Sequence, residues 1–144
     1  MTYNPLLGPI VALVAWSIVM LCWMVVTRMP ALKKVGIDLS TRVGSNPGGL
    51  DGVVDDKAQW KAHNYIHLME QPTLFYAIVF ALILMGQNFP LNVGLAWTYV
   101  GLRIVHSIVQ ATWNRILVRF ILFALSTLCL LALTLHAAIG LLHG

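Results

Sequence analysis

Four long apolar runs constrain this chain more than any other feature of its sequence. They cover about residues 6–27, 64–85, 90–110 and 116–142. As a helix the first run is about 33 Å long, enough to cross the ~30 Å hydrocarbon layer of a bilayer. Charged residues make up only 10% of the chain, against about 25% in soluble domains. Because lipid cannot hydrogen-bond the backbone, the runs predict an all-α membrane protein, a single domain of four transmembrane helices over residues 1–144.

The one sizeable polar segment, residues 28–63, separates the first two runs. We expect the first span to end at Arg28 and Pro30, and Gly44 to Gly49 to form turns. Asp55 or Asp56 offers an N-cap, with Gln59 in the position of a capping-box partner. The second helix therefore begins in water, several residues before the membrane.

Basic residues predict the orientation of the bundle. Every lysine and arginine except Arg103 follows the first or the third span, namely Arg28, Lys33, Lys34, Arg42, Lys57, Lys61, Arg115 and Arg119. The opposite side, residues 1–5 and 86–89, has none. The positive-inside rule thus places loop 28–63 in the cytoplasm and both termini outside. This bias explains the net charge of +4, and without a basic stripe interleaved with aromatics we expect no nucleic-acid partner.

Ionisable residues inside spans are costly and need a partner or a role. Glu70 lies about two turns into the second helix, and Arg103 about two turns before the end of the third. These helices run antiparallel through a short turn, so we expect Glu70 and Arg103 to form an ion pair at matching depth. Such a pair either contributes to a site or fixes helix register with nothing bound.

Polar residues form one stripe on each of three helices. They are His63, His67 and Glu70 on the second helix, Arg103, His106 and Gln110 on the third, and Arg115 and Arg119 on the fourth. Helical spacing puts each set on one face, toward the cytoplasmic half of the bundle. Guanidinium groups bind carboxylates bidentately, so the cluster suits an anionic ligand. We expect Arg115 to extend toward lipid headgroups and Arg119, one turn deeper, to serve the ligand.

Pro72 lies inside the second predicted helix and should kink it, leaving the Leu68 carbonyl without its donor. Either the bilayer simply tolerates this proline, or the kink opens room beside Glu70. A metal site at His63, His67 and His106 is a third option, but HxxxH alone is a weak signal and we expect no metal.

Two stretches resemble a known family. HNYIHLMEQPTLFY, from His63 to Tyr76, and WTYVGLRIVHS, from Trp97 to Ser107, together with Arg119, are similar to signatures of the MAPEG family (membrane-associated proteins in eicosanoid and glutathione metabolism). The similarity is greatest to the bacterial branch and extends over nearly the whole chain.

The resemblance implies a homotrimer that binds glutathione between subunits near the cytoplasmic face. It further implies that Arg119 is the catalytic, thiol-activating arginine, since a nearby cation favours the thiolate. The expected glutathione-binding residues are Arg28, His63, His67, Glu70, Arg103, His106, Gln110 and Arg115. Where the family has an arginine, an asparagine and a tyrosine, this chain has His63, His67 and Gln110.

Two functions remain open at this point. The first is a glutathione-dependent transferase or peroxidase acting on small lipophilic electrophiles in the bilayer, with glutathione as co-substrate. The alternative is a non-catalytic membrane binding or scaffold protein that keeps the fold, which the substitutions at His63, His67 and Gln110 favour.

Overall fold

The computed structural model describes residues 3–38, 40–41, 43–44 and 49–143, and these contain helices, turns and no strand. Arg42 and the central part of the predicted turn, residues 45–48, lie outside the described residues. The helices are α1 (Leu7–Lys34), α2 (Asp56–Met69), α3 (Gln71–Leu84), α4 (Pro90–Thr112) and α5 (Ile116–His143). The predicted all-α bundle is confirmed.

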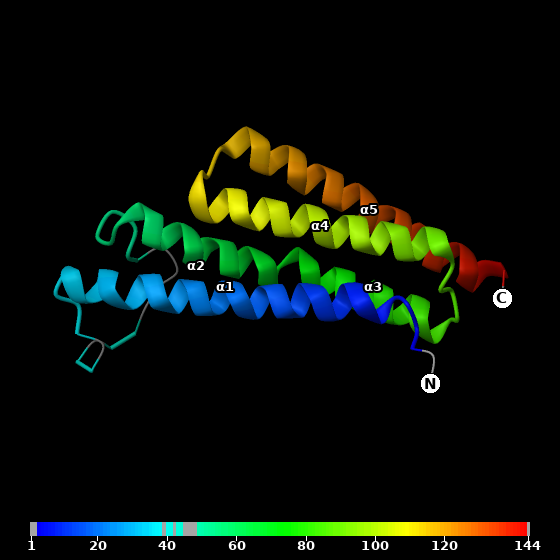
Figure 1. The fold of residues 1–144 in the computed structure, drawn as a ribbon, viewed down its shortest axis with the longest axis horizontal. Helices are drawn as coiled ribbons and strands as arrows, with labels where there is room; N and C mark the ends of the chain where they lie inside the picture. Colours follow the sequence, from blue (N-terminus) through cyan, green and yellow to red (C-terminus); the bar gives the residue numbers. More distant parts are fainter. Residues whose placement is uncertain (1–2, 39, 42, 45–48, 144) are drawn as a thin grey trace.

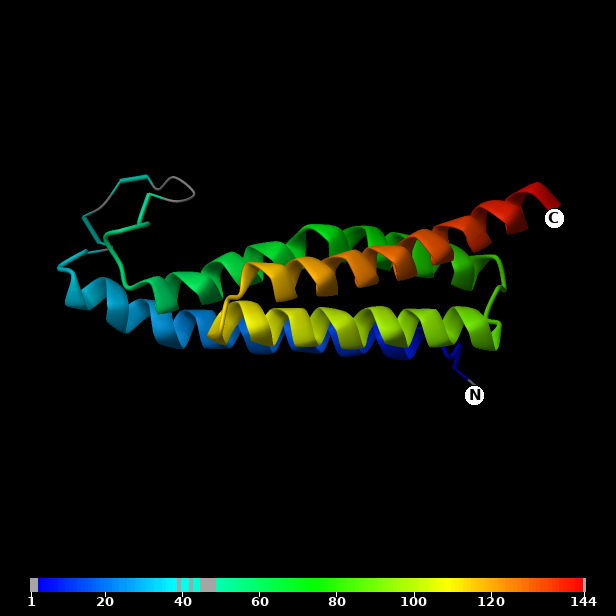
Figure 2. The ribbon, with the colours of Figure 1, turned by 90° about the horizontal axis from the view of Figure 1, so that it is seen from above.

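The helices form four antiparallel rods, because α2 and α3 follow one another along a single line (Figure 1). Both chain ends lie at one end of the bundle, and the long loop lies at the other (Figure 2). α4 contacts α1, α2 and α5. α1 and α2 project past the α4–α5 turn at the loop end (Figure 1).

The helices bury one face each and leave large apolar side chains exposed on the others. The shared core includes Leu13, Phe75, Tyr99 and Leu133, none of them exposed, and the Phe75 and Tyr99 rings stack with centroids 4.3 Å apart. α1, the joined α2–α3 rod and α5 are long and apolar enough to cross a membrane. The apolar outer faces therefore suit contact with lipid.

α4 is less apolar, and it is not among these three candidate spans. Its polar residues Arg103, His106, Ser107 and Gln110 are buried inside the bundle. A helix that carries its polar groups inward lowers its mean hydropathy without exposing those groups to lipid.

α1 is longer than predicted and continues through Pro30 to Lys34. A proline removes one backbone donor, which a helix survives when other contacts hold its last turn. Here Leu32 packs against Val54 and Ala58 in a small core at the loop end. The helix therefore extends beyond the predicted span of about residues 6–27.

α2 begins at Asp56 with Asp55 as its N-cap residue, as expected. No side chain caps it, however, and the Gln59 amide donates instead to Asp51 Oδ1 at 3.1 Å. The capping-box prediction is thus wrong, because a loop carboxylate competes for Gln59.

The predicted second span, 64–85, is two helices rather than one kinked helix. Glu70 leaves the helical region (φ −85°, ψ −97°) and separates α2 from α3, and Pro72 lies in the first turn of α3. Proline suits a first turn, where its missing N–H has no helical acceptor. The disruption that Pro72 predicts is confirmed, and its location is Glu70.

Candidate functional site

The turn between α4 and α5 positions Arg119. Asn114 adopts a positive φ of 51° there, a conformation that asparagine tolerates better than most residues. Its Oδ1 accepts a hydrogen bond from Arg119 Nη1 at 2.7 Å. Arg119 Nε is buried and has no hydrogen-bond partner among the described residues. One edge of the guanidinium is therefore anchored while Nε remains available.

Arg119 lines a cavity of about 250 Å³ between the start of α5 and the α2 and α4 helices. Three of the lining residues carry nitrogen donors or acceptors and three are apolar, namely His67, His106 and Arg119, with Ile116, Phe120 and Phe123. A mainly apolar wall strengthens the interaction of a fixed cation with any anion that enters. The cavity is therefore suited to an anionic atom on an otherwise apolar molecule.

Two histidines form the wall opposite α5. The His67 ring stacks on Phe123 at 6.4 Å and meets the His106 ring edge-on at 5.7 Å. His67 Nδ1 is hydrogen-bonded to a carboxylate oxygen of Glu70. His106 is buried and His67 is about one-third exposed. The imidazole of His67 is thus held by His106 of α4, by Phe123 of α5 and by Glu70 between α2 and α3.

The predicted Glu70–Arg103 ion pair is not formed. In the described part of the chain Glu70 pairs with His67, and Arg103 Nη2 donates to the His67 carbonyl at 3.0 Å. α2 ends at Met69, two residues after His67, so the His67 carbonyl lies at a helix C-terminus, where it accepts the Glu70 N–H at 3.4 Å and where a cation is favourable. Arg103 thus reaches the backbone of His67, and the Glu70 side chain is directed to the His67 ring.

The remaining predicted ligands lie away from the cavity wall. His63 is exposed and 3.5 Å from Asp51, and Arg115 lies over the Trp113 ring at 4.8 Å. Gln110 is buried with Oε1 unpartnered among the described residues. Arg28 is half-buried on α1. Of the residues singled out from sequence, the cavity brings together His67, His106 and Arg119.

Sequence reasoning missed the apolar half of the cavity. Ile116, Arg119, Phe120 and Phe123 follow the spacing i, i+3, i+4 and i+7, which places them on one helix face. The same spacing occurs on every other apolar helix face of the chain, so it did not distinguish the cavity wall from a lipid-facing surface. No group of three His, Cys, Asp or Glu side chains in the described ranges is placed to hold a metal ion.

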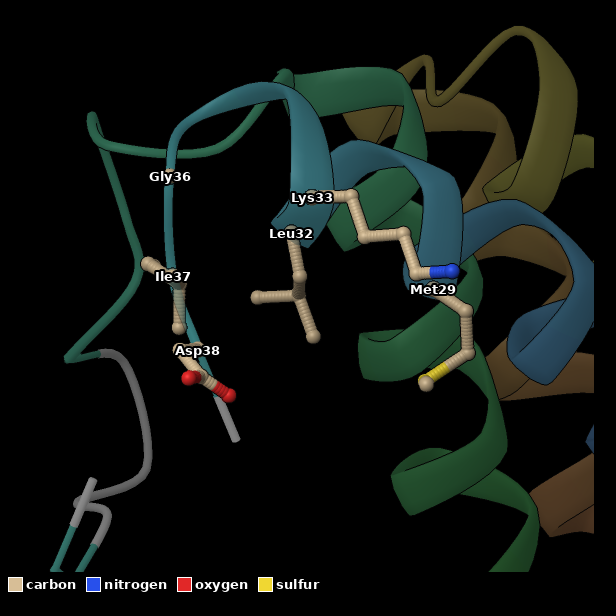
Figure 3. A pocket seen from close by; sticks show the side chains of 6 residues that line it. All are labelled: Met29, Leu32, Lys33, Gly36, Ile37 and Asp38. Atoms are coloured by element: carbon tan, nitrogen blue, oxygen red, sulfur yellow. The ribbon is translucent and has the colours of Figure 1, made fainter. Parts of the chain in front are cut away.

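A second cavity, of about 420 Å³, lies at the loop end of α1 between Met29 and Lys33 on one side and Gly36 to Asp38 on the other (Figure 3). The Ser40 hydroxyl and amide donate to Asp38 at 2.7 and 2.9 Å, and these bonds lower the pKa of the Asp38 carboxyl. Asp38 is therefore ionised near neutral pH and offsets the charge of Lys33. The cavity has no net attraction for an anion and is a weaker candidate than the Arg119 cavity.

Comparison with protein families identifies the family of this chain. The model of the MAPEG family matches residues 6–139, nearly the whole chain. The chain belongs to the MAPEG family. Searches of individual curated proteins and of solved structures gave no significant match. Membership and the apolar helices make it an integral membrane protein, and the matched range of this MAPEG chain includes every cavity residue named above.

Proposed function

We propose that this protein is a glutathione-dependent transferase or peroxidase that acts on lipophilic electrophiles dissolved in the bilayer. The observation that supports this most is the buried, unpartnered Nε of Arg119 at the wall of a mainly apolar cavity. A cation in such a place favours the thiolate over the thiol. Membership of the MAPEG family is consistent with glutathione as the source of that thiol.

The reaction then follows from the thiolate. In a transferase the sulfur forms a bond to an electrophilic carbon, and a leaving group departs with the electron pair of the broken bond. In a peroxidase the sulfur attacks one oxygen of a hydroperoxide, the O–O bond breaks and an alcohol leaves. A second glutathione then reduces the resulting sulfenic acid, giving a disulfide and water. Ile116, Phe120 and Phe123 supply the apolar surface that such substrates need.

We further propose a homotrimer in which a neighbouring copy completes the glutathione site. Glu70 and His63 were predicted to bind glutathione, yet both are exposed and lie off the cavity wall in a single chain. A second subunit packed against this face would bring their polar groups to the edge of the cavity. Native mass spectrometry in detergent tests this assembly, and a monomeric protein would contradict it.

We also propose that loop 28–63 is cytoplasmic and both termini are outside. The support is the distribution of basic residues described above. To test the orientation, single cysteines are placed in the loop or near the C-terminus of the protein, and intact cells are labelled with a thiol reagent. A reagent that cannot cross the membrane should modify only the terminal cysteine.

Calorimetry with glutathione on the purified protein in nanodiscs tests the proposed activity. We expect saturable binding by the wild type and ultraviolet absorbance of a bound thiolate. Arg119→Ala should lose the thiolate signal, whereas Lys34→Ala, which removes a charge at the exposed end of α1, should keep it. No binding at millimolar glutathione would instead favour the non-catalytic scaffold.

A further inference from the structure

The break between α2 and α3 places a carboxylate against an imidazole at the cavity. Glu70 is the single residue between the two helices, and its side chain is 58% exposed. Its carboxylate accepts a hydrogen bond from Nδ1 of His67, and His67 is one of the residues that line the cavity. Such a bond selects the tautomer with the proton on Nδ1 and leaves a lone pair on Nε2.

The second ring nitrogen of His67, Nε2, is available to accept a proton. No described residue forms a hydrogen bond with Nε2, while Phe123 and His106 hold the ring on its face and its edge. Arg119 lies on the wall of the same cavity. A base fixed by a third group, beside a site that stabilises the conjugate anion, is the arrangement that activates nucleophiles.

We propose that His67, oriented by Glu70, is the general base that takes the proton of the thiol in this cavity. This rests on the proposed glutathione chemistry and adds to Arg119 a second residue with a separate role. The S–H bond breaks, its electron pair stays on sulfur, and its proton moves to His67 Nε2. When the thiolate has attacked, the proton passes to the leaving group or to water and the neutral imidazole is restored.

The groups around His67 are placed for this proton transfer. The Glu70 carboxylate is bonded to Nδ1, and Arg119 lies on the wall of the same cavity, where its charge favours the thiolate. His106 meets the ring edge-on. Arg103 contacts His67 through the backbone carbonyl rather than through the ring. Glu70 therefore has a defined role, which is to orient the His67 ring through Nδ1 and keep Nε2 as the proton acceptor.

Stopped-flow measurement of thiolate formation across pH tests the proposal on full-length protein in nanodiscs. The variants are His67→Asn, which keeps a polar group within reach of Glu70, and Glu70→Gln, which removes the charge alone. His143→Asn is the control, because His143 bonds to the Ile139 carbonyl far from the cavity. Glutathione binding by calorimetry is measured in parallel for each protein.

In the wild type we expect the rate of thiolate formation to rise with pH through one ionisation. His67→Asn should still bind glutathione, form the thiolate about 100-fold more slowly and lose that ionisation from the profile. Glu70→Gln should move the ionisation to lower pH, because the imidazolium has lost its carboxylate. The profile of His143→Asn should match that of the wild type.

Three results would overturn the role of His67. One is an unchanged profile in His67→Asn with the thiolate still formed, which would leave the proposed function intact. Another is loss of glutathione binding in that variant, which would make His67 a ligand and not a base. The third is a wild type that forms no thiolate, in which case the proposed function fails as well. If His67→Asn does not fold, an unshifted profile in Glu70→Gln is sufficient to reject the proposal.

Discussion

Replacing Arg103 by methionine tests the hydrogen bonding of the buried polar centre. Arg103 is 1% exposed and is among the largest fully buried side chains described. Its Nη2 bonds to the His67 carbonyl, while Nε and Nη1 have no partner in the described part of the chain. Methionine is also long and unbranched, so the variant removes the charge without opening a large cavity.

Two magnitudes decide the expected result. The lost hydrogen bond from a charged donor contributes about 1.5–3 kcal/mol. Burying a cation that has no counter-charge costs several kcal/mol, and Arg103→Met removes that cost. We therefore expect the free energy of unfolding to stay within about 1 kcal/mol of the wild type or to rise.

Equilibrium unfolding in mixed detergent micelles measures this difference, with Arg103→Met, Glu70→Gln and the double variant compared side by side. If Arg103 and Glu70 were a buried ion pair, Arg103→Met would cost about 3–5 kcal/mol and adding Glu70→Gln would recover most of it. That pattern would refute the hydrogen bonding described here. Additive effects of the two substitutions would support it.

Three further substitutions test single contacts. Gln71→Leu should lower the free energy of unfolding by about 2 kcal/mol, since its amide bonds to Thr127 at 2.8 Å and to two more hydroxyls on α4 and α5; an unchanged thermal midpoint would contradict this. A double-mutant cycle of Asn64→Ala and Ser107→Ala should give a coupling energy of about 0.6–1.7 kcal/mol for their 2.7 Å hydrogen bond between α2 and α4. A coupling energy of zero would show that this hydrogen bond does not stabilise the protein. Gly86→Ala should cost about 1–2 kcal/mol by backbone strain alone, because φ is +70° and a Cβ would meet nothing within 4 Å; chemical denaturation that shows no loss would argue against the strained turn.

The Gln71 contacts also show why sequence patterns miss internal networks. Gln71 Oε1 accepts from Tyr99 at 3.3 Å and from Ser126 at 3.5 Å. The three residues come from three helices and are separated by 28 and 55 positions in the chain. No spacing rule within one helix relates them, so only the packed bundle identifies them as partners.

The local chemistry of the sequence was sufficient to predict the helices. A bilayer leaves an apolar run no alternative to internal backbone hydrogen bonding, so the four runs predicted the four rods of the bundle. The inward face of α4 was equally predictable, because Arg103, His106 and Gln110 recur at helical spacing. The sequence also carried the resemblance that the match over residues 6–139 confirms.

Tertiary structure decided which polar groups meet. Sequence spacing placed Glu70 and Arg103 at one depth, but it could not state that the chain leaves the helix at Glu70. At this break the Glu70 carboxylate meets His67, and Arg103 shares the His67 carbonyl with the Glu70 N–H. Helical periodicity determines the face that a residue occupies, whereas the direction of a side chain at a break depends on the contacts around it. The sequence thus determined the bundle and the candidate residues, and the packing of α2, α4 and α5 selected the three that line the cavity.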